Sequence, residues 1–556
     1  MSIGSDHAQR VRVGTFKRGS MATLAAWIEE NTTIAGAKFS FLNHEFQKTI
    51  ASDTSQEVNV KKPSQVGLSE LSARLALAMT KVVRGSTAIY TLPTATFAST
   101  FMKTRIDPVI RGSEALRNSV HKSNDNNEVK QIDDSFLYLR GAASSNAAIS
   151  IPADFIINDE LDFCDQEIVS QYASRVTHSS WKLFRRFSTP TIPGYGIDKA
   201  FIESRRFHNL CKCNHCATWF KPDYYEHVKI PGYTDDIRSL TNSSTLYRTR
   251  WREAHLACPK CGKEPSLQPE HRNYVLENTD DDFVPAAYQV TPFDAPNIIK
   301  VSDILQARLR YEREQDFVNF VLGLAMEDKD STLMRSDLRF RHDLPSAPTR
   351  VMGIDVGHTY HAWIAEVTHA GVYLIHREQI PMGSIRTRYF ELKRQYNVAL
   401  SVIDSQPHAE TVMYLQALDP NLYASVYVNS KDVLTHEVKE RDEEKDEGKN
   451  FVRQVNVNRS RAFDAYMNDM REGTISFRAS DDDETVIAHH TSMKRVRVWD
   501  DKTQNLVHSW VKTDGVDHYH HAGLYAWVAA KILGVASPLI MLPIFGAHSF
   551  RVRVKQ

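Results

Sequence analysis

Short apolar runs alternate with stretches of helical periodicity in the N-terminal part of the chain. The segment LSELSARLALAMTKVV, residues 68–83, has the spacing of apolar positions expected of a helix, and a second helix is predicted after Pro93. Four short runs predict strands between such helices: residues 58–60, 88–92, 136–139 and 153–157. Strands and helices that alternate at this spacing predict a mostly parallel α/β sheet.

A second β-rich pattern begins after a polar stretch at residues 326–350, which we interpret as the main domain boundary. Three runs predict antiparallel strands, at residues 351–356, 362–367 and 371–376. A further strand at residues 400–403 and a closing helix at about 517–533 follow. We therefore expect an N-terminal domain at residues 1–335, a linker at 336–349 and a C-terminal α/β domain at 350–556.

Two further polar stretches predict exposed segments, a loop at residues 121–134 and a solvated charge run at 431–450. The tract from Leu524 to Ala547 is the most apolar in the chain, but Lys531 and two prolines interrupt it. It therefore predicts a buried helix followed by an extended segment rather than a membrane span. The first residues, MSIGSDHAQRVRVG, lack the apolar core of a secretory signal.

The composition is typical of a soluble, intracellular, multidomain protein. Hydrophobic residues make up 42% and charged residues 24% of the 556 residues, which excludes global disorder. The 68 basic and 68 acidic residues give a formal net charge of zero, which excludes a histone-like binder but not a local basic groove for nucleic acid. The six cysteines are too few for a disulfide framework, and five of them cluster at residues 211–261, which indicates a metal site in a reducing compartment.

The segment KKPSQVGLS, residues 61–69, ends a predicted strand and opens a predicted helix. A phosphate loop of the form GxxxxGK[ST] needs a glycine, a lysine and a hydroxyl at the start of a helix. Gly67 and Ser69 are in place, Leu68 occupies the usual lysine position, and Lys61 and Lys62 are the cations at the front of the loop. An ordinary strand–turn–helix remains the alternative.

Two carboxylates end the apolar strand FIINDE, and they suit ATP hydrolysis. Asp159 can hold Mg²⁺ through water and Glu160 can polarise the attacking water, although a buried strand with an exposed acidic end is the alternative. Further along the chain, Ser188, Thr189 and Thr191 in FSTPT follow another apolar run and can sense a γ-phosphate from a strand tip. Gln47, in a helical stretch before the loop, can contact an adenine.

Two CxxC knuckles form the most specific local signal in the chain. They contribute four thiols, Cys213, Cys216, Cys258 and Cys261, with 41 residues between the knuckles (258 − 216 − 1). Each short turn presents two thiolates to one ion, so we predict a structural zinc site that pins an insertion at residues 207–272. Cys211 competes with Cys213 as a ligand, and contact of this module with DNA remains open.

Three carboxylates follow the linker at positions suited to a two-metal nuclease. Asp355 lies in the first strand of the second domain, Asp404 ends a later strand, and Asp517 opens the last helix. Acids at these three places converge in an RNase-H-like fold and hold metal ions across a scissile phosphate. The alternatives are a capped core acid for Asp355 and an ordinary strand-end cap for Asp404. His521, four residues after Asp517, is either a proton shuttle, a further ligand or a partly buried histidine.

The order of these motifs resembles the large subunit of tailed-bacteriophage terminases, in the lambda-like branch. The resemblance rests on KKPSQVGLSE, TLPTATFASTFMKTRI, FIINDE, FSTPT, the CxxC pairs, GIDVG, VIDSQPHAET and DHYHHAGLYAWVA, over about residues 40–535. It implies an ASCE-type P-loop ATPase domain with a zinc-binding insertion, followed by an RNase-H-like nuclease domain. Such a protein uses ATP to move double-stranded DNA into a procapsid and cuts concatemeric DNA with a metal-dependent endonuclease.

The resemblance also implies the partners and the cofactors. The partners are double-stranded DNA, a small terminase subunit, the portal protein of the procapsid and further copies of the chain in a pentamer-like ring. The resemblance implies no membrane and a location in the host cell cytoplasm. The cofactors are ATP, Mg²⁺ or Mn²⁺, and Zn²⁺. The resemblance also assigns roles to residues. It implies phosphate binding by Lys62, Gln65 and Gly67, Mg²⁺ binding by Ser69 and Asp159, and hydrolysis by Glu160. It further implies coupling by Ser188, Thr189 and Thr191, and nuclease metal binding by Asp355, Asp404 and Asp517.

The sequence departs from the family pattern at three places. Leu68 stands where most phosphate loops have lysine, although this branch places its lysine early. Gln65 stands where relatives often have arginine, so Arg140 is a candidate source of that charge. His521 replaces the second acid of a DHxxDA motif, so the third nuclease ligand is open among Asp514, Asp517 and His521.

Two other classes of protein share part of this pattern. A transposase or integrase with a zinc module shares the three-carboxylate fold but has no need of the Lys62 loop or the FIINDE strand, so ATP binding separates it from a terminase. A zinc-dependent, DNA-binding structural protein predicts neither ATPase nor nuclease activity. Whether cutting occurs at a specific site or by a headful is not encoded in these motifs.

Overall fold

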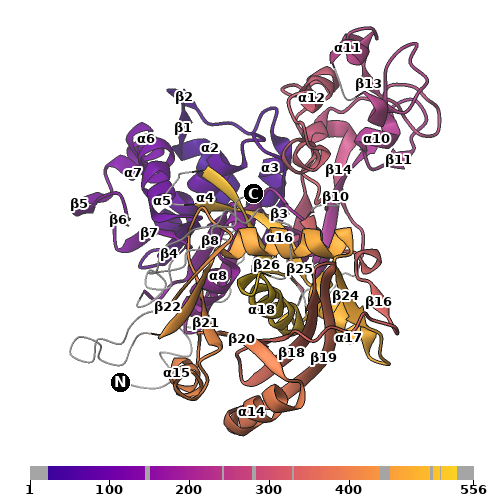
Figure 1. Cartoon of the computed structure of the whole chain (residues 1–556). Coiled ribbons are helices and arrows are strands. Elements are labelled where there is room, and N and C mark those ends of the chain that lie inside the picture. Colours follow the sequence, from indigo (N-terminus) through magenta and orange to yellow (C-terminus); the bar gives the residue numbers. More distant parts are fainter. Residues whose placement is uncertain are drawn as a thin grey trace. The chain divides into compact units, whose positions relative to one another are not determined.

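The computed structural model describes residues 23–143, 151–240, 243–278, 284–328, 331–438, 451–500, 505–513 and 515–534. The chain forms two compact units, residues 1–327 with 497–507, and residues 328–496 with 508–556. Each unit contains one large β-sheet (Figure 1). None of the described helices is long and apolar enough to cross a membrane, and the predicted extended segment after residue 534 lies outside the described residues.

The first unit contains an 11-stranded sheet. The strand order is β11 (Trp219–Phe220), β10 (Arg205–Lys212), β15 (Ala286–Gln289), β3 (Glu57–Lys61), β9 (Leu183–Ser188), β8 (Phe155–Asp159), β4 (Thr87–Leu92), β7 (Ser135–Gly141), β6 (Val129–Ile132) and β5 (Val120–Asp125), with β14 (Arg272–Leu276) also paired to β10. The central strands from β10 to β7 are parallel, which confirms the predicted α/β sheet. Because β9 lies between β3 and β8, the carboxyl ends of these three strands meet at one edge of the sheet.

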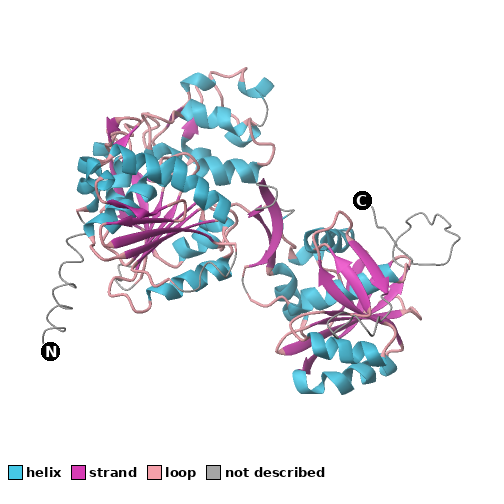
Figure 2. Ribbon diagram, turned by 90° about the vertical axis from the view of Figure 1, so that its left-hand side faces the viewer, coloured by secondary structure: helices cyan, strands magenta, loops and turns pink. Residues whose placement is uncertain are grey.

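Helices cover both faces of this sheet (Figure 2). The described helices up to residue 202 are α2 (Leu24–Asn31), α3 (Glu45–Ala51), α4 (Leu68–Val82), α5 (Ala95–Phe101), the π-helix η1 (Met102–Ile106), α6 (Asp107–Gly112), α7 (Glu114–Arg117), α8 (Gln166–Ala173) and α9 (Gly196–Ile202), besides short 3₁₀ turns. The predicted helix at residues 68–83 is confirmed as α4, which is buried along almost its whole length.

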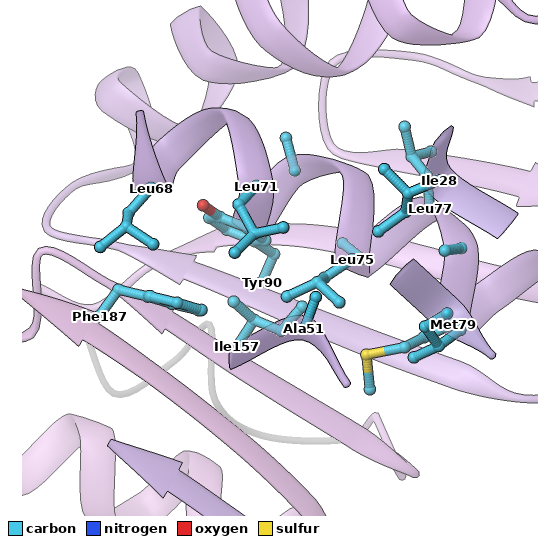
Figure 3. Packing of buried hydrophobic residues seen from close by; sticks show 14 of the residues in the cluster. Ile28, Ala51, Leu68, Leu71, Leu75, Leu77, Met79, Tyr90, Ile157 and Phe187 are labelled. Atoms are coloured by element: carbon cyan, nitrogen blue, oxygen red, sulfur yellow. The ribbon is translucent and has the colours of Figure 1, made fainter. Parts of the chain in front are cut away.

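Helix α4 packs its leucines onto the sheet. Leu68, Leu71 and Leu75 extend from one side of the helix toward Tyr90 and Phe187 of the strands (Figure 3). The 3.6-residue period of the helix places these leucines on one face. This buried contact holds the start of α4 at the sheet edge where β3 ends.

The predicted insertion has its own small core. It contains α10 (Tyr224–His227), β12 (Val228–Lys229), α11 (Ser243–Leu246) and β13 (His255–Leu256), and its apolar residues pack with α12 (Val301–Arg308), α13 (Glu314–Phe317) and the π-helix η9 (Val318–Leu322). Three of the predicted zinc ligands, Cys213, Cys216 and Cys258, belong to this core or pack against it.

The expected loop at residues 121–134 is wrong, because the segment forms the hairpin of β5 and β6. The polar sequence of this segment gave no sign of the strand pairing, which is supported by an ion pair with a residue outside the segment. Lys130 is buried, and its ammonium group forms an ion pair with Asp107 of α6 at 2.9 Å and another with Asp125. A buried charged residue is tolerated in a strand where it is paired with an opposite charge.

The second unit contains a nine-stranded sheet. The order is β16 (Phe340–Arg341), β24 (Ile475–Arg478), β19 (Gly371–Pro381), β18 (Thr359–Thr368), β17 (Arg350–Asp355), β20 (Val398–Asp404), β21 (Leu422–Tyr427), β23 (Arg453–Val457) and β22 (Leu434–Val438). Strands β17, β18 and β19 are antiparallel, as predicted, while β20 and β21 continue the sheet in parallel. Part of the expected charge run at residues 431–450 is therefore strand β22, and residues 439–450 lie outside the described part.

The remaining elements of this part of the chain are α14 (Ile385–Gln395), α15 (Ala409–Leu418), α16 (Arg459–Glu472), α17 (Asp483–Thr491), α18 (His518–Ile532) and the paired strands β25 (Met493–Asp500) and β26 (Asn505–Lys512). Helix α18, the predicted closing helix, packs against the centre of the sheet at β17. A Cβ atom on Gly353 would lie 2.1 Å from the carbonyl oxygen of Ala522 and from the backbone nitrogen of Ala526. Only glycine permits this approach, which brings the start of α18 close to the end of β17.

Candidate nucleotide and metal sites

The loop between β3 and α4 has the tight backbone of a phosphate loop. Gln65 and Gly67 both have positive φ angles, 60° and 77°, and Gly67 caps the N-terminus of α4. The buried side chain of Gln47 braces this loop, because its Nε2 donates a hydrogen bond to the carbonyl oxygen of Val66 at 2.9 Å. A Cβ atom on Gly67 would lie only 2.8 Å from that nitrogen, so glycine is needed at this turn.

Lys62, rather than Lys61, faces the predicted catalytic carboxylates. The Nζ atom of Lys62 lies 3.0 Å from Oε1 of Glu160, and the lysine is 4% exposed. Burial would lower the pKa of Lys62, but the carboxylates of Glu160 and Asp159 outweigh it and raise the pKa above its ordinary value. Lys61 instead forms a buried ion pair with Asp198 of α9 at 2.8 Å.

Asp159 is buried at the end of β8 and well supplied with hydrogen bonds. The hydroxyl group of Tyr90 donates to its Oδ2 atom at 2.8 Å, and its partners also include the hydroxyl of Ser69. Burial and the negative charge of Glu160 raise the pKa of Asp159, against the opposing effect of Lys62. Glu160 itself has a φ of 55°, a left-handed conformation that non-glycine residues adopt mainly where the surrounding structure requires it.

Asp162 joins the acidic strand end to the FSTPT segment, and the sequence analysis missed it. Its Oδ2 accepts hydrogen bonds from the backbone N–H of Thr191 at 2.8 Å and from the hydroxyl of Thr191 at 2.9 Å. Its own N–H donates to Oγ of Ser188 at 3.0 Å, and that hydroxyl donates to the carbonyl oxygen of Thr189. Burial raises the pKa of Asp162 to about 7. The spacing Glu160-x-Asp162 was the available signal, but an acid three residues beyond the end of β8 has no distinctive pattern.

A cavity of about 220 Å³ opens at this edge of the sheet. Its lining includes Ser69, Asp159, Glu160 and Arg105, together with Phe97, Thr100, Phe101 and Thr104. Arg105 lies on η1 and forms an ion pair with Glu70 of α4 at 2.5 Å. Sequence reasoning singled out Arg140 instead, which pairs with Glu128 at 3.1 Å and is absent from the described lining of this cavity.

The four predicted zinc ligands meet in the insertion. Their sulfur atoms all lie within 4.8 Å of one another, with Sγ–Sγ distances of 3.7 Å from Cys213 to Cys261 and 3.6 Å from Cys216 to Cys258. Four sulfurs about 2.3 Å from one tetrahedral zinc ion are about 3.8 Å apart, so the donor set fits zinc. Cys211 lies outside this group, with its Sγ 3.5 Å from the carbonyl oxygen of Ser266.

The three acids predicted for the second unit have different partners. Oδ2 of Asp355 lies 2.8 Å from Nδ1 of His518, and Asp404 accepts a hydrogen bond from the hydroxyl of Tyr525 at 2.6 Å. Burial raises the pKa of Asp404, and the negative charge of Asp355 adds to this effect. The two acids are therefore close enough to interact electrostatically.

Asp517 is held in its ionised form at the N-terminus of α18. Its carboxylate lies 3.4 Å from Nε2 of His521 and 3.5 Å from Nζ of Lys512. Burial would raise the pKa of Asp517, but these partners lower it well below its usual value. Asp514, the reserve for the third ligand, lies outside the described residues.

A histidine that sequence reasoning missed also faces Asp355. Besides the four cysteines, the described residues contain one other close group of metal-type ligands, Asp355, His361 and His518, whose donor atoms lie within 4.8 Å of one another. His361 lies on β18 directly across from Asp355. Only strand pairing brings it there, so its position in the sequence gave no signal.

Comparison with known proteins gives one sequence match. Residues 42–278 match the family model described as the ATPase domain of the phage terminase large subunit gpA. Among curated proteins, none matches the chain.

Three solved structures are among those similar to the chain. The large terminase of bacteriophage HK97 is 12% identical, with 91% of this chain and 98% of that chain covered and a TM-score of 0.46. The large terminase of the thermophilic bacteriophage D6E is 8% identical, with 92% and 98% covered and a TM-score of 0.30. The large terminase ATPase domain of Thermus phage P74-26 is 13% identical, with 50% and 90% covered and a TM-score of 0.31.

Proposed function

We propose that the chain is a phage terminase large subunit, because residues 42–278 match the family model of the ATPase domain of that subunit. As a terminase ATPase it is part of a DNA-packaging motor. We propose that it couples ATP hydrolysis to translocation of double-stranded DNA into a procapsid and cuts concatemeric DNA with a metal-dependent endonuclease. The observation that carries the motor activity is the Lys62–Glu160 contact of 3.0 Å at the cavity beside the phosphate loop.

Hydrolysis uses the residues around that cavity. Lys62 moves from Glu160 to the β- and γ-phosphates of ATP, which frees Glu160 to accept a proton from the attacking water. Ser69 and Asp159 offer the hydroxyl and carboxylate oxygens that Mg²⁺ prefers, and they already contact each other at the cavity wall. When bound, Mg²⁺ neutralises the charge that develops on the phosphates. The roles of Gln65 and Gly67 at the phosphates, and of Gln47 at the adenine, belong to this proposal.

Coupling to DNA passes through Asp162. Its carboxylate bonds the backbone and the hydroxyl of Thr191, and its N–H bonds Ser188, while Glu160 lies only two residues away. A shift of Glu160 during hydrolysis therefore displaces the FSTPT segment, including Thr189, through contacts that are already formed.

The nuclease belongs to the second unit. The strand order β19-β18-β17-β20-β21, with three antiparallel strands followed by two parallel ones, supports an RNase-H-like fold. Asp355, Asp404 and Asp517 would hold Mg²⁺ or Mn²⁺, and the metal would supply the positive charge that orients the phosphodiester and lowers the pKa of the attacking water. The charge interaction between Asp355 and Asp404 supports their joint role. We retain the division into a motor domain at 1–335, a linker at 336–349 and a nuclease domain at 350–556.

The packaging context follows from the same proposal. The partners are double-stranded DNA, a small terminase subunit, the portal protein and further copies of the chain in a pentameric ring, in the host cytoplasm. The alternative is an RNase-H-like transposase or integrase with a zinc module, which ATP turnover would exclude.

A single assay, run with and without ATP, tests the proposal. Purified protein is incubated with plasmid DNA and Mg²⁺ or Mn²⁺, with and without ATP, and both phosphate release and DNA nicking are followed. We expect ATP turnover together with metal-dependent cleavage. Cleavage without ATP turnover would favour the transposase, and the absence of both activities in the zinc-loaded protein would favour a DNA-binding structural protein.

Zinc binding by the insertion gives a prediction that distinguishes Cys211 from the four cysteines that we propose as zinc ligands. We expect Cys258→Ser to lose its zinc and to make residues 207–272 sensitive to trypsin, because a small core of this kind depends on its metal. Cys211→Ser should keep one zinc ion per chain. Elemental analysis and limited proteolysis measure both effects, and loss of zinc from Cys211→Ser would contradict the assignment.

Arg105 gives a second prediction, since it lines the cavity from within the same chain. We expect Arg105→Ala to lower kcat for ATP about 10- to 100-fold, because a charge-assisted hydrogen bond to phosphate is worth about 1.5–3 kcal/mol. Arg140→Ala is the matched control and should change kcat of the isolated protein less than about twofold, because Arg140 is not among the described residues that line the cavity. The opposite ranking of the two variants in steady-state ATPase assays would overturn the role of Arg105.

A further inference from the structure

Two histidines lie next to Asp355, His361 on the sheet and His518 on the last helix. His361 is the cross-strand neighbour of Asp355 in the β17–β18 pair, and His518 is the first residue of α18. The two imidazole rings are stacked, with centroids 4.4 Å apart and planes 12° from parallel. Nδ1 of His518 lies 2.8 Å from Oδ2 of Asp355. One donor atom from each of the three residues falls within 4.8 Å of the others.

One ring nitrogen of this cluster is buried without a partner. His361 is 5% exposed, and its Nδ1 atom is shielded from solvent and accepts or donates no hydrogen bond in the structure. A buried polar atom without a hydrogen-bond partner is unfavourable, and coordination of a metal ion is one interaction that would satisfy it. Asp355 and His518, by contrast, are hydrogen-bonded to each other.

The position of His518 is set independently of Asp355. The backbone N–H of Tyr519, the next residue, donates to Nδ1 of His489 at 2.9 Å. This contact joins the first turn of α18 to α17. Together with the close approach of α18 to Gly353, it holds His518 beside β17.

We propose that Asp355, His361 and His518 bind a first-row transition-metal ion, so that the nuclease site holds this metal through two imidazoles and one carboxylate. The proposal rests on the nuclease activity proposed above and names the metal class that the site takes. Metal–nitrogen bonds of about 2.1 Å require donors no more than about 4.2 Å apart, so the donor atoms need to close by at most about 0.6 Å. Imidazole nitrogen favours transition-metal ions, whereas Mg²⁺ prefers an all-oxygen environment.

Asp404 has a separate role in this arrangement. It is bonded to Tyr525 and lies outside the three-residue group. Variants of the two histidines therefore test the new site, while a variant of Asp404 tests the oxygen ligands of the nuclease.

The test measures metal binding by the zinc-loaded full-length protein, whose four-cysteine site is already filled. Mn²⁺ is titrated in, free Mn²⁺ is followed by its EPR signal, and pulsed EPR detects ¹⁴N coupled to the bound ion. We expect direct imidazole coupling in the wild type and Mn²⁺ binding that a tenfold excess of Mg²⁺ does not abolish. His361→Gln and His518→Gln should each weaken Mn²⁺ binding by at least about tenfold and reduce the ¹⁴N signal. His358→Gln, an exposed histidine near the end of β17, is the control and should bind as the wild type does.

The outcomes separate this inference from the nuclease proposal. Bound Mn²⁺ without ¹⁴N coupling in the wild type would overturn the inference while leaving an all-oxygen nuclease intact, and this result needs no folded variant. Coupling that survives in both histidine variants would also overturn it. Nitrogen-coupled Mn²⁺ in a protein that cleaves no DNA with any metal would support the inference and contradict the nuclease.

Discussion

Glu160→Gln is expected to lower ATP turnover about 10²- to 10⁴-fold without weakening ATP binding. The glutamine keeps the shape of the side chain but cannot accept a proton from water, and general-base catalysis contributes a factor of this size. Binding should survive because Lys62, which contacts Glu160 at 3.0 Å, loses a competing partner and remains available to the phosphates. Steady-state phosphate release gives the rate, and titration with a fluorescent ATP analogue gives the affinity.

Glu167→Gln is the matched control for this experiment. Glu167 is exposed in the first turn of α8 and lies outside the cavity lining, so its variant should turn over ATP at the wild-type rate. A Glu160→Gln variant within tenfold of the wild type would show that another group activates the water. Because Glu160 adopts a left-handed backbone, thermal unfolding of both variants should confirm that the fold is retained.

Asp355→Asn is expected to lower DNA cleavage at least about 100-fold while ATP turnover stays within about twofold of the wild type. A bound metal ion contributes several kcal/mol to hydrolysis, and each 1.4 kcal/mol is a factor of ten. Asparagine keeps the shape of the buried strand end and its contact with His518 but removes the charge that holds the metal. Nicking of supercoiled plasmid and phosphate release, measured on the same preparation, give the two rates.

Asp343→Asn provides the control for charge removal in the same unit, since Asp343 is exposed ahead of β17. It should cut DNA as the wild type does. Normal cleavage by Asp355→Asn would show the nuclease assignment to be wrong. Loss of ATP turnover together with cleavage would instead indicate that the variant is misfolded.

Local sequence patterns predicted the elements that depend on short stretches of chain. The helix at residues 68–83 and the strand ending in Asp159 are confirmed because their burial patterns are strong and continuous. The prediction failed at residues 121–134, where an ion pair between Lys130 and Asp107 stabilises a polar hairpin. A partner 23 residues away (130 − 107) leaves no periodic signal in the segment itself.

In the nucleotide site too, the sequence predicted local features, and only the structure showed which residues face one another. The motifs predicted a phosphate loop and two carboxylates, with Lys61 and Lys62 as the available cations, and only the family resemblance pointed to Lys62. The structure assigns them because successive side chains of a strand point in different directions, which turns Lys61 toward Asp198 and Lys62 toward Glu160. Arg105 and Asp162 were missed because their roles depend on which helix and which strand end face the cavity.

The amino-acid sequence by itself determined the four-cysteine group, because each knuckle brings two thiols together within a single turn and only two knuckles must meet. It also determined the acids at the strand ends, since a carboxylate after an apolar run is visible without any partner. Only the tertiary structure decided which residues these groups face. The contact of Lys62 with Glu160 spans 98 residues of chain and that of Asp355 with His518 spans 163, and His361 reaches Asp355 through strand register alone. Such contacts follow from the order of strands in a sheet, which side-chain periodicity does not encode.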